Sequence, residues 1–201
     1  MPVSRKRKRS PPAAAPSAKA PPQLPDRRIK LAQKALSLSP LCADAYVLLA
    51  QEQAASPAEA LDLYQRGVEA GELALGPDAF VEDIGHFWGL LETRPYMRAR
   101  HGLAMALWAL GKHDEAIGHY QDMLRLNPGD NQGIRYMLFN ALLDLEREAE
   151  IETLLDRYGD DGAAAWLWGR VLFAFRRHGD SPATRDLLAV ARKGNPHVVD
   201  Y

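Results

Sequence analysis

Apolar residues recur along most of this chain at intervals of three and four positions, the spacing that brings them onto one face of an α-helix. One such stripe contains Trp168, Val171, Leu172 and Phe175. From Asp26 onward the stripes follow one another, and no segment alternates apolar and polar residues as a half-buried strand would. The pattern predicts an all-α protein without a β-sheet.

Two segments of the chain repeat one pattern. The segments AIGHYQDMLRLNP (116–128) and TRDLLAVARKGNP (184–196) begin with a small residue, carry an apolar residue four positions later and end in Asn-Pro. Their prolines, Pro128 and Pro196, are 68 residues apart, which is twice 34. Because 34 residues is the period of tetratricopeptide repeats, the sequence predicts a tetratricopeptide-like solenoid of antiparallel helical hairpins.

A 34-residue frame divides most of the chain into units. Three units fit at 97–130, 131–164 and 165–198, and a fourth near 43–69 has a turn that is two residues short. Residues 32–40 resemble the second helix of an earlier, incomplete unit. Two helices alone cannot bury their apolar faces, so each unit is expected to pack on its neighbours.

The predicted turns contain residues that start and stop helices. Ser-Pro at 56–57 and at 181–182 is typical of an N-cap followed by a proline in the first helical position. Asn-Pro at 127–128 and at 195–196 should end the preceding helices, because the residue before a proline disfavours helical geometry. Together these signals predict about nine helices after the N-terminal tail.

The stretch between the fourth unit and residue 97 does not fit the frame. Its apolar residues are spaced as on one face of a helix, which predicts an inserted helix over 77–92. These residues are Phe80, Ile84, Phe87, Trp88 and Leu91. The inserted helix either packs against the array or shapes a binding surface.

The N-terminus has a different composition from the rest of the chain. Residues 1–25 contain seven prolines and six Lys or Arg but no acidic residue, although the whole chain has a net charge of −1. Such a segment cannot bury enough apolar surface to offset its ordering entropy, so we predict a disordered basic tail before a folded body at 26–201. The run Arg5–Arg9 is a nuclear-import signal, a nucleic-acid contact or a solubilising arm.

Composition and targeting signals limit where in the cell the protein is expected. Hydrophobic residues make up 47% of the chain, yet no stretch has the roughly 20 apolar residues that span a bilayer. The basic N-terminus lacks the apolar core of a secretory signal, and the single cysteine, Cys42, excludes an internal disulfide. We therefore expect a cytoplasmic protein that makes no membrane contact.

Motifs that carry chemistry are mostly absent. The chain has no phosphate-binding loop, no Gly-x-Ser-x-Gly elbow and no His-Glu-x-x-His motif. His113 and His119 are six residues apart on different helix faces, which argues against shared metal ligation. Glu82, Asp83 and His86 form either an acid/base group or, the preferred interpretation, a solvated polar face. We predict no enzyme activity, no cofactor and no bound metal.

Two longer segments, HFWGLLETRPYMRARHGLAMALWALGKHDEAIGHYQDMLRLNPGDNQGIRY (86–136) and GNPHVVDY (194–201), resemble the suppressor-of-tumorigenicity-7 protein family and its shorter bacterial relatives. The resemblance covers about residues 27–201, and RPYMR, NPGDNQGIRY and NPHV are its most specific parts. It implies a tetratricopeptide-like array without an agreed biochemical activity. The membrane segments of animal members are not found here, and relatives continue beyond NPHV, so the chain is a short member or a truncation.

In tetratricopeptide arrays the first helix of each unit lines a concave groove, and the resemblance implies that frame positions 2, 5, 9 and 12 face it. From these positions we select seven candidate groove residues: Arg98, His101, Trp108, Gln132, Arg135, Trp166 and Arg176. Arginine and tryptophan are suited to interface anchors, and paired guanidinium groups can hold a carboxylate. The competing explanation is that these arginines pair with Asp130, Asp144 or Glu92 and only join the repeats.

The leading functional hypothesis is a protein-interaction scaffold that binds a partner peptide or protein in the concave groove. The two arginines Arg98 and Arg135 suggest a partner segment with acidic residues beside apolar ones. The alternative is a nucleic-acid-associated protein that uses the basic tail, and a third hypothesis is an enzyme with an unrecognised site near His86.

Overall fold

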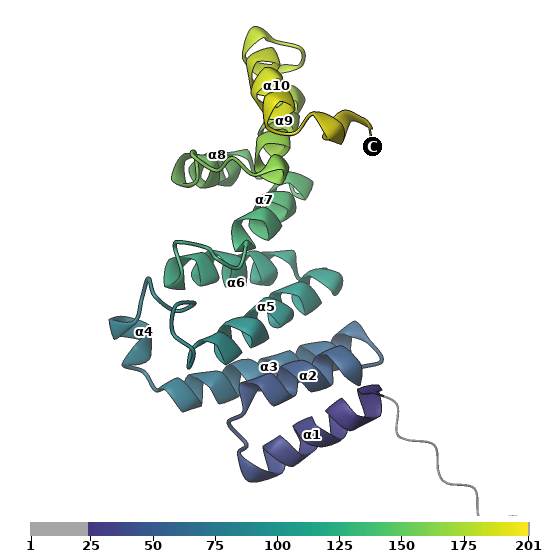
Figure 1. Ribbon diagram of the computed structural model, residues 1–201, viewed down its shortest axis with the longest axis vertical. Helices are drawn as coiled ribbons and strands as arrows, with labels where there is room; N and C mark the ends of the chain where they lie inside the picture. Colours follow the sequence, from purple (N-terminus) through teal and green to yellow (C-terminus); the bar gives the residue numbers. More distant parts are fainter. Residues whose placement is uncertain (1–23, 201) are drawn as a thin grey trace, which may run out of the picture.

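The computed structural model describes residues 24–200, and this part of the chain folds into ten α-helices and one short 3₁₀ helix, without a strand (Figure 1). In chain order the elements are α1 (Leu24–Leu38), α2 (Ala43–Glu52), α3 (Pro57–Leu75), α4 (Ala79–Glu82), α5 (Arg94–Ala109), α6 (His113–Leu126), α7 (Ile134–Asp144), α8 (Glu148–Arg157), α9 (Ala164–His178), α10 (Pro182–Gly194) and η1 (Pro196–Asp200). The predicted all-α helical-repeat fold is confirmed.

The helices stack along the long axis of the molecule. Helices α2, α3, α5 and α6 form a closely packed block, and α1 covers one end of it (Figure 1). Helix α7 rises steeply from the level of α6, and α8, α9 and α10 follow above it (Figure 1). The contact of α7 with α9 is much smaller than the contact of α2 with α5. The array is therefore tighter in its N-terminal half than in its C-terminal half.

The predicted helix boundaries at Ser-Pro and Asn-Pro are confirmed. The hydroxyl oxygen of Ser56 accepts a hydrogen bond from the backbone N–H of Glu59 at 3.2 Å, and Ser181 accepts one from Thr184 at the same distance. Each serine thereby satisfies one of the unpaired donors at a helix start. Helices α6 and α10 end directly before Asn127 and Asn195.

Glycine allows an unusually close approach between α3 and α5. A Cβ atom added to Gly71 would lie 2.9 Å from the Cβ of Tyr96, and one added to Gly102 would overlap the ring of Tyr64. A larger side chain at Gly71 would press on the backbone of Tyr96, and one at Gly102 would require the Tyr64 ring to move. These contacts explain why the block around α3 and α5 is the most densely packed part of the described chain.

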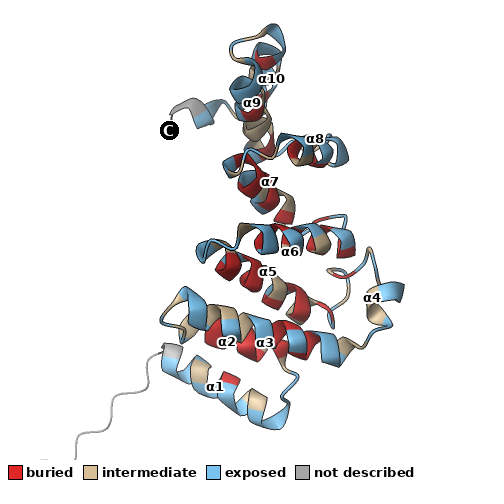
Figure 2. Cartoon of the chain, turned by 180° about the vertical axis from the view of Figure 1, so that it is seen from behind, coloured by how far each residue is buried: buried red, intermediate tan, exposed pale blue. Residues whose placement is uncertain are grey.

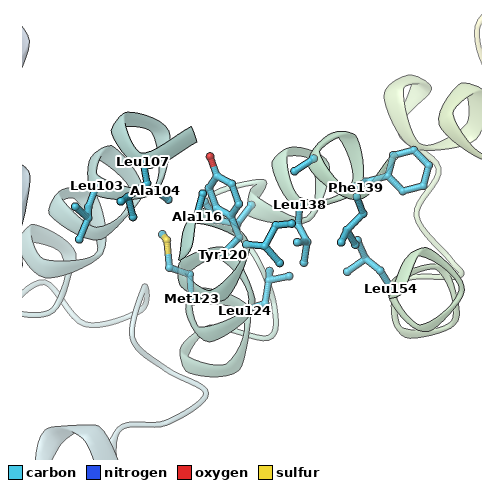
Figure 3. Close-up of a cluster of buried hydrophobic side chains, with 14 of the residues drawn as sticks. Leu103, Ala104, Leu107, Ala116, Tyr120, Met123, Leu124, Leu138, Phe139 and Leu154 are labelled. Atoms are coloured by element: carbon cyan, nitrogen blue, oxygen red, sulfur yellow. The ribbon is translucent and has the colours of Figure 1, made fainter. Parts of the chain in front are cut away.

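One continuous apolar core runs through most of the array. It begins at Val47 in α2 and reaches Phe173 in α9, and the buried residues concentrate on the facing sides of the helices (Figure 2). Figure 3 shows its middle part, where Tyr120 of α6 lies between the apolar residues of α5 and Leu138 of α7. Each hairpin therefore depends on its neighbours for burial, as the repeat pattern predicts.

The predicted inserted helix over 77–92 is wrong. The structure contains only the single-turn helix α4 in this segment, and turns follow it up to Thr93. Gly85 has a φ of +95°, which a continuing right-handed helix does not allow. Its N–H donates to the carbonyl oxygen of Leu126 at 2.9 Å instead. Phe87 is fully buried by this fold, whereas Leu91 is exposed, so the apolar spacing does not mark one buried face.

The predicted tail over residues 1–25 lies outside the described residues, except that Leu24 and Pro25 form the start of α1. Within the described range, no helix combines the length and the apolar composition needed to cross a membrane.

Candidate functional site

Helix α5 carries four of the side chains that the repeat frame assigns to the groove. Arg98, His101, Met105 and Trp108 follow one another at helical spacing along one side of the helix. Met105 is 54% exposed and Arg98 is also exposed, whereas His101 and Trp108 are half-buried. These four residues are called the α5 surface below. It is accessible at its start and at its middle.

Arg98 connects the α5 surface to α2 through a two-pronged ion pair with Asp44. Its Nε donates to Oδ1 at 2.8 Å, and its Nη2 donates to Oδ2 at 2.6 Å. The hydrogen bonds to Asp44 raise the pKa of Arg98, although partial burial opposes them. The two side chains remain 41% and 45% exposed. An exposed pair contributes only about 0–1 kcal/mol, so its groups stay available to a second molecule.

The two half-buried rings of the α5 surface pack toward α6. The ring of His101 lies 6.3 Å from that of Tyr120, and burial lowers the pKa of His101, which favours the neutral ring. The ring of Trp108 lies 4.2 Å from that of His113 at the start of α6. Both rings therefore lie against α6, below the exposed side chains of the α5 surface, instead of projecting into solvent.

Arg135, at the start of α7, is held inside the protein by two carboxylates. Its Nη1 donates to Oδ2 of Asp130 at 2.8 Å, and its Nε donates to Oδ2 of Asp161 at 2.6 Å. The guanidinium group also lies over the rings of Tyr136 and Tyr158, at 4.4 Å and 5.4 Å from their centroids. Its side chain is only 16% exposed. This arrangement matches the intramolecular role that the sequence left open for Arg135.

Hydrogen bonds fix the charge of Asp161 in this cluster. Burial acts to raise the pKa of Asp161, but hydrogen bonds from the Ala163 N–H, the Tyr136 hydroxyl and Arg135 outweigh it and leave the pKa below its usual range. For Arg135, burial acts to lower the pKa, and the bonds to the two aspartates raise it overall. Both groups therefore carry their charges at neutral pH.

Asp130 also builds the turn that leads into α7. Its Oδ1 accepts from the N–H of Ile134 at 2.7 Å and its Oδ2 from the N–H of Arg135 at 2.9 Å. Asp130 and Gly133 both have positive φ, at 45° and 76°. The carboxylate thus replaces the missing partners of the first helical N–H groups, and it is almost fully buried. Within the segment NPGDNQGIRY, Asp130 and Gly133 thus form the turn into α7.

The three other candidate residues occupy different environments. Trp166 is 1% exposed and packs against Phe139 at 5.4 Å between ring centroids, so the expectation that it lines an open groove is not met. Gln132 is half-buried. Arg176 is exposed and donates to the carbonyl oxygen of Leu143 at 3.1 Å, beside a hollow of about 680 Å³ between α7, α8 and α9. The seven candidates therefore do not form one continuous surface.

The sequence did not point to Asp44, Asp161, Tyr136 and Tyr158 as partners of the candidate arginines. Asp130 and Arg135 are five residues apart in one segment, and this spacing was a usable signal. Arg98 and Asp44 are 54 residues apart, and Arg135 and Asp161 are 26 apart. The first pairing depends on how α2 packs on α5, and the second on how the start of α7 meets the loop before α9; the repeat frame contains neither.

The residues considered for chemistry remain separate. In residues 24–200 there is no group of three or more His, Cys, Asp or Glu side chains arranged to hold a metal ion. Cys42 is a half-buried free thiol before α2. His86 is exposed in the loop after α4.

A protein of known crystal structure has a similar fold. The crystal structure of YrrB, described as a TPR protein with an unusual peptide-binding site, matches with a TM-score of 0.59 and 18% sequence identity. The match covers 86% of this chain and 78% of that one. At this identity the likeness shows a shared tetratricopeptide-like fold.

The sequence comparisons are more specific. The family model described as ST7 protein matches residues 21–165. The suppressor of tumorigenicity 7 protein-like of Gallus gallus is 31% identical over 199 residues, covering 88% of this chain and 36% of the relative. The suppressor of tumorigenicity 7 protein of Macaca fascicularis is 28% identical over 190 residues, covering 83% and 35%. The chain spans about a third of the length of these curated relatives. On these matches, the chain belongs to the ST7 (suppressor of tumorigenicity 7) protein family.

Proposed function

We propose that the chain is a protein-interaction scaffold that binds a partner peptide or protein along α2 and α5. The observation that carries the proposal is the exposure of Met105 in the middle of the most tightly packed block. Its neighbours on the α5 surface are a charged pair, Arg98 with Asp44, and the half-buried ring of Trp108. A flexible apolar side chain between a polar contact and an aromatic ring is suited to holding an extended or helical peptide.

The charges also indicate what kind of segment would fit. Arg98 keeps its Nη1 group outside the two-pronged bond to Asp44, and an exposed guanidinium can donate to a carboxylate of a partner. Arg135 is engaged with two aspartates, so it does not provide a second guanidinium group. We therefore propose a mainly apolar partner segment with one acidic group near Arg98, in place of a clamp formed by two arginines.

A peptide-display selection against the full chain would test the proposal. Selected peptides should bind the Met105→Ala variant about fivefold to thirtyfold more weakly, since a buried methionine contributes about 1–2 kcal/mol. Met137→Ala is the matched control, because Met137 is 44% exposed on α7, away from the α5 surface. Thermal unfolding of both variants should resemble that of the original chain.

Peptides that bind the original chain and Met105→Ala equally well would contradict the proposed site. Equal weakening by Met105→Ala and Met137→Ala would indicate a general effect on folding or solubility and would contradict it as well. Arg98→Ala supplies the second test, because it should weaken acidic peptides more than neutral ones.

A further inference from the structure

A hollow of about 820 Å³ lies where the end of α3 meets α4, α5 and α6. Apolar side chains form much of its wall, and among them Leu73 is 72% exposed and Phe80 is half-buried. Helix α5 contributes Tyr96, on the side of the helix away from the α5 surface. Glu69 and Glu72 of α3 line the same space. This space is called the α3–α4 hollow below.

The charged groups of the α3–α4 hollow leave it with a net negative charge. Arg100 forms an ion pair with Asp122, so each of these groups already has a partner of opposite charge. Glu69 and Glu72 form no ion pair within residues 24–200, and Glu69 accepts only a long hydrogen bond, 3.5 Å, from Gln65. The hollow therefore combines apolar walls with two carboxylates that lack a cation.

The N-terminal segment of the same chain has the complementary charge. Residues 1–25 contain six of the 25 Lys and Arg and none of the 26 Asp and Glu, so the rest of the chain is negatively charged. The run Arg5–Arg9 consists of five consecutive Lys or Arg residues. Such side chains can lay their aliphatic stems on an apolar wall while their charged ends reach carboxylates. The run therefore matches both properties of the hollow.

The chain between the run and α1 is long enough to reach the hollow. Arg28 pairs with Glu52 at 2.5 Å, which places the start of α1 beside the end of α2, close to where α3 begins. The hollow lies roughly 20–30 Å further along α3, at 1.5 Å per residue, and α1 is about two helix-packing distances of 8–10 Å from α3. Residues 10–23 include five prolines and span about 43 Å at 3.1 Å per residue.

A second hollow lies nearer to α1, but its carboxylates already have partners. It has a volume of about 470 Å³ and is lined by Glu59 and Asp62 near the start of α3. Glu59 accepts a hydrogen bond from the N–H of Ala55 at 2.9 Å, and Asp62 pairs with Arg66 at 3.9 Å. The α3–α4 hollow is therefore the better match for a run of cations.

We propose that the run Arg5–Arg9 binds in the α3–α4 hollow of its own chain, with side-chain stems on Leu73 and Phe80 and charged groups at Glu69 and Glu72. Exposed ion pairs are weak individually, but the covalent connection to α1 raises the local concentration of the run. An acidic molecule that binds the run has to displace it from the hollow. The site does not depend on the α5 surface, so it adds an intramolecular contact to the proposed scaffold.

Paramagnetic relaxation in the full chain would test this contact. A nitroxide label is attached to Ser4→Cys in a Cys42→Ser background, and backbone amide signals are recorded by NMR. Signals of residues 69–80 should lose most of their intensity at low salt. They should recover in about 1 M NaCl, where the screening length falls to about 3 Å.

Charge-neutralising variants would identify the carboxylates that hold the run. The double variant Glu69→Gln, Glu72→Gln should restore the signals of residues 69–80 at low salt, and both side chains are exposed, so the fold is retained. The matched control is Asp144→Asn, Glu146→Gln, because this exposed pair lies at the end of α7, beyond α6 in the array (Figure 1). The control should leave the loss of signal unchanged.

Four outcomes would overturn the proposal. The first is a loss of signal that is absent or spread evenly over the chain. The second is a loss centred on Glu59 and Asp62, which would place the run in the other hollow. The third is a loss that persists when Glu69 and Glu72 are both replaced by glutamine. The fourth is a loss that requires the label and the observed amides to be on different molecules, since a second copy would then supply the run.

Discussion

Arg135→Ala should lower the free energy of unfolding much more than Arg98→Ala, although both arginines form ion pairs with aspartate. The difference follows from burial. The pair of Arg98 and Asp44 is more than two-fifths exposed, whereas Arg135 is 16% exposed and its partner Asp130 is 1% exposed. Water can replace a lost partner for Asp44 but not for Asp130.

The expected magnitude can be worked out from the contacts that remain. Without Arg135 the carboxylate of Asp130 keeps the N–H groups of residues 134 and 135, and Asp161 keeps the Tyr136 hydroxyl and the Ala163 N–H. Of the four hydrogen bonds that the guanidinium donates, the two to carboxylates contribute most, at about 1.5–3 kcal/mol each, and the donors that remain on the aspartates reduce the effect of losing them. The net destabilisation should be about 2–4 kcal/mol, against about 0–1 kcal/mol for Arg98→Ala.

Urea unfolding followed by circular dichroism would measure both variants. Because repeat arrays can unfold in parts, hydrogen exchange of the α7 amides should accompany it and show where protection is lost. Arg135→Lys should recover only part of the stability, since an ammonium group cannot copy the fork that reaches two carboxylates. Equal destabilisation by Arg135→Ala and Arg98→Ala, or unchanged exchange in α7, would refute the assignment of Arg135 to this role.

Two further predictions concern packing and pH. Gly102→Ala should destabilise the chain by about 1–3 kcal/mol, because the new methyl group would overlap the ring of Tyr64. Gly118→Ala, an open helical position, should stabilise it by about 0.5–1 kcal/mol in the same urea titration. The pKa of Asp161 is lower in the folded chain than its unfolded value of about 3.9, so its stabilising contribution is complete above that pH. It is lost as the pH falls through the folded pKa, and Asp161→Asn should flatten the measured stability profile below about pH 4.

The sequence predicted the helices well because their signals are local. Apolar spacing marked the helical faces, and the Ser-Pro pairs supplied caps that the structure contains at Ser56 and Ser181. The segment after α3 shows the limit of such signals. Phe80, Phe87 and Leu91 have helical spacing, but the positive φ of Gly85 directs the chain to the end of α6. The chain therefore leaves the helical path that the periodicity predicts.

The candidate site was harder to predict, because the repeat frame assumes that every unit packs in the same way. The frame applies to α5, where Arg98 and Met105 are exposed on one face. At α9 the same assumption fails for Trp166, which is covered by Phe139 and Tyr158. The orientation of α7 sets these contacts, and it depends on the turn at Asp130 and on an aspartate 26 residues from Arg135. Pairings over such distances in sequence have no local signature.

The uneven packing along the array has a mechanical consequence. Most helix contacts join elements that are close in sequence. A force applied to the two ends of the array would therefore act on the interfaces in series. The interface between α7 and α9 is much smaller than the interface between α3 and α5 but would carry the same load, so it should separate first. Tension would detach the C-terminal hairpin in one step and leave the N-terminal block at its original length.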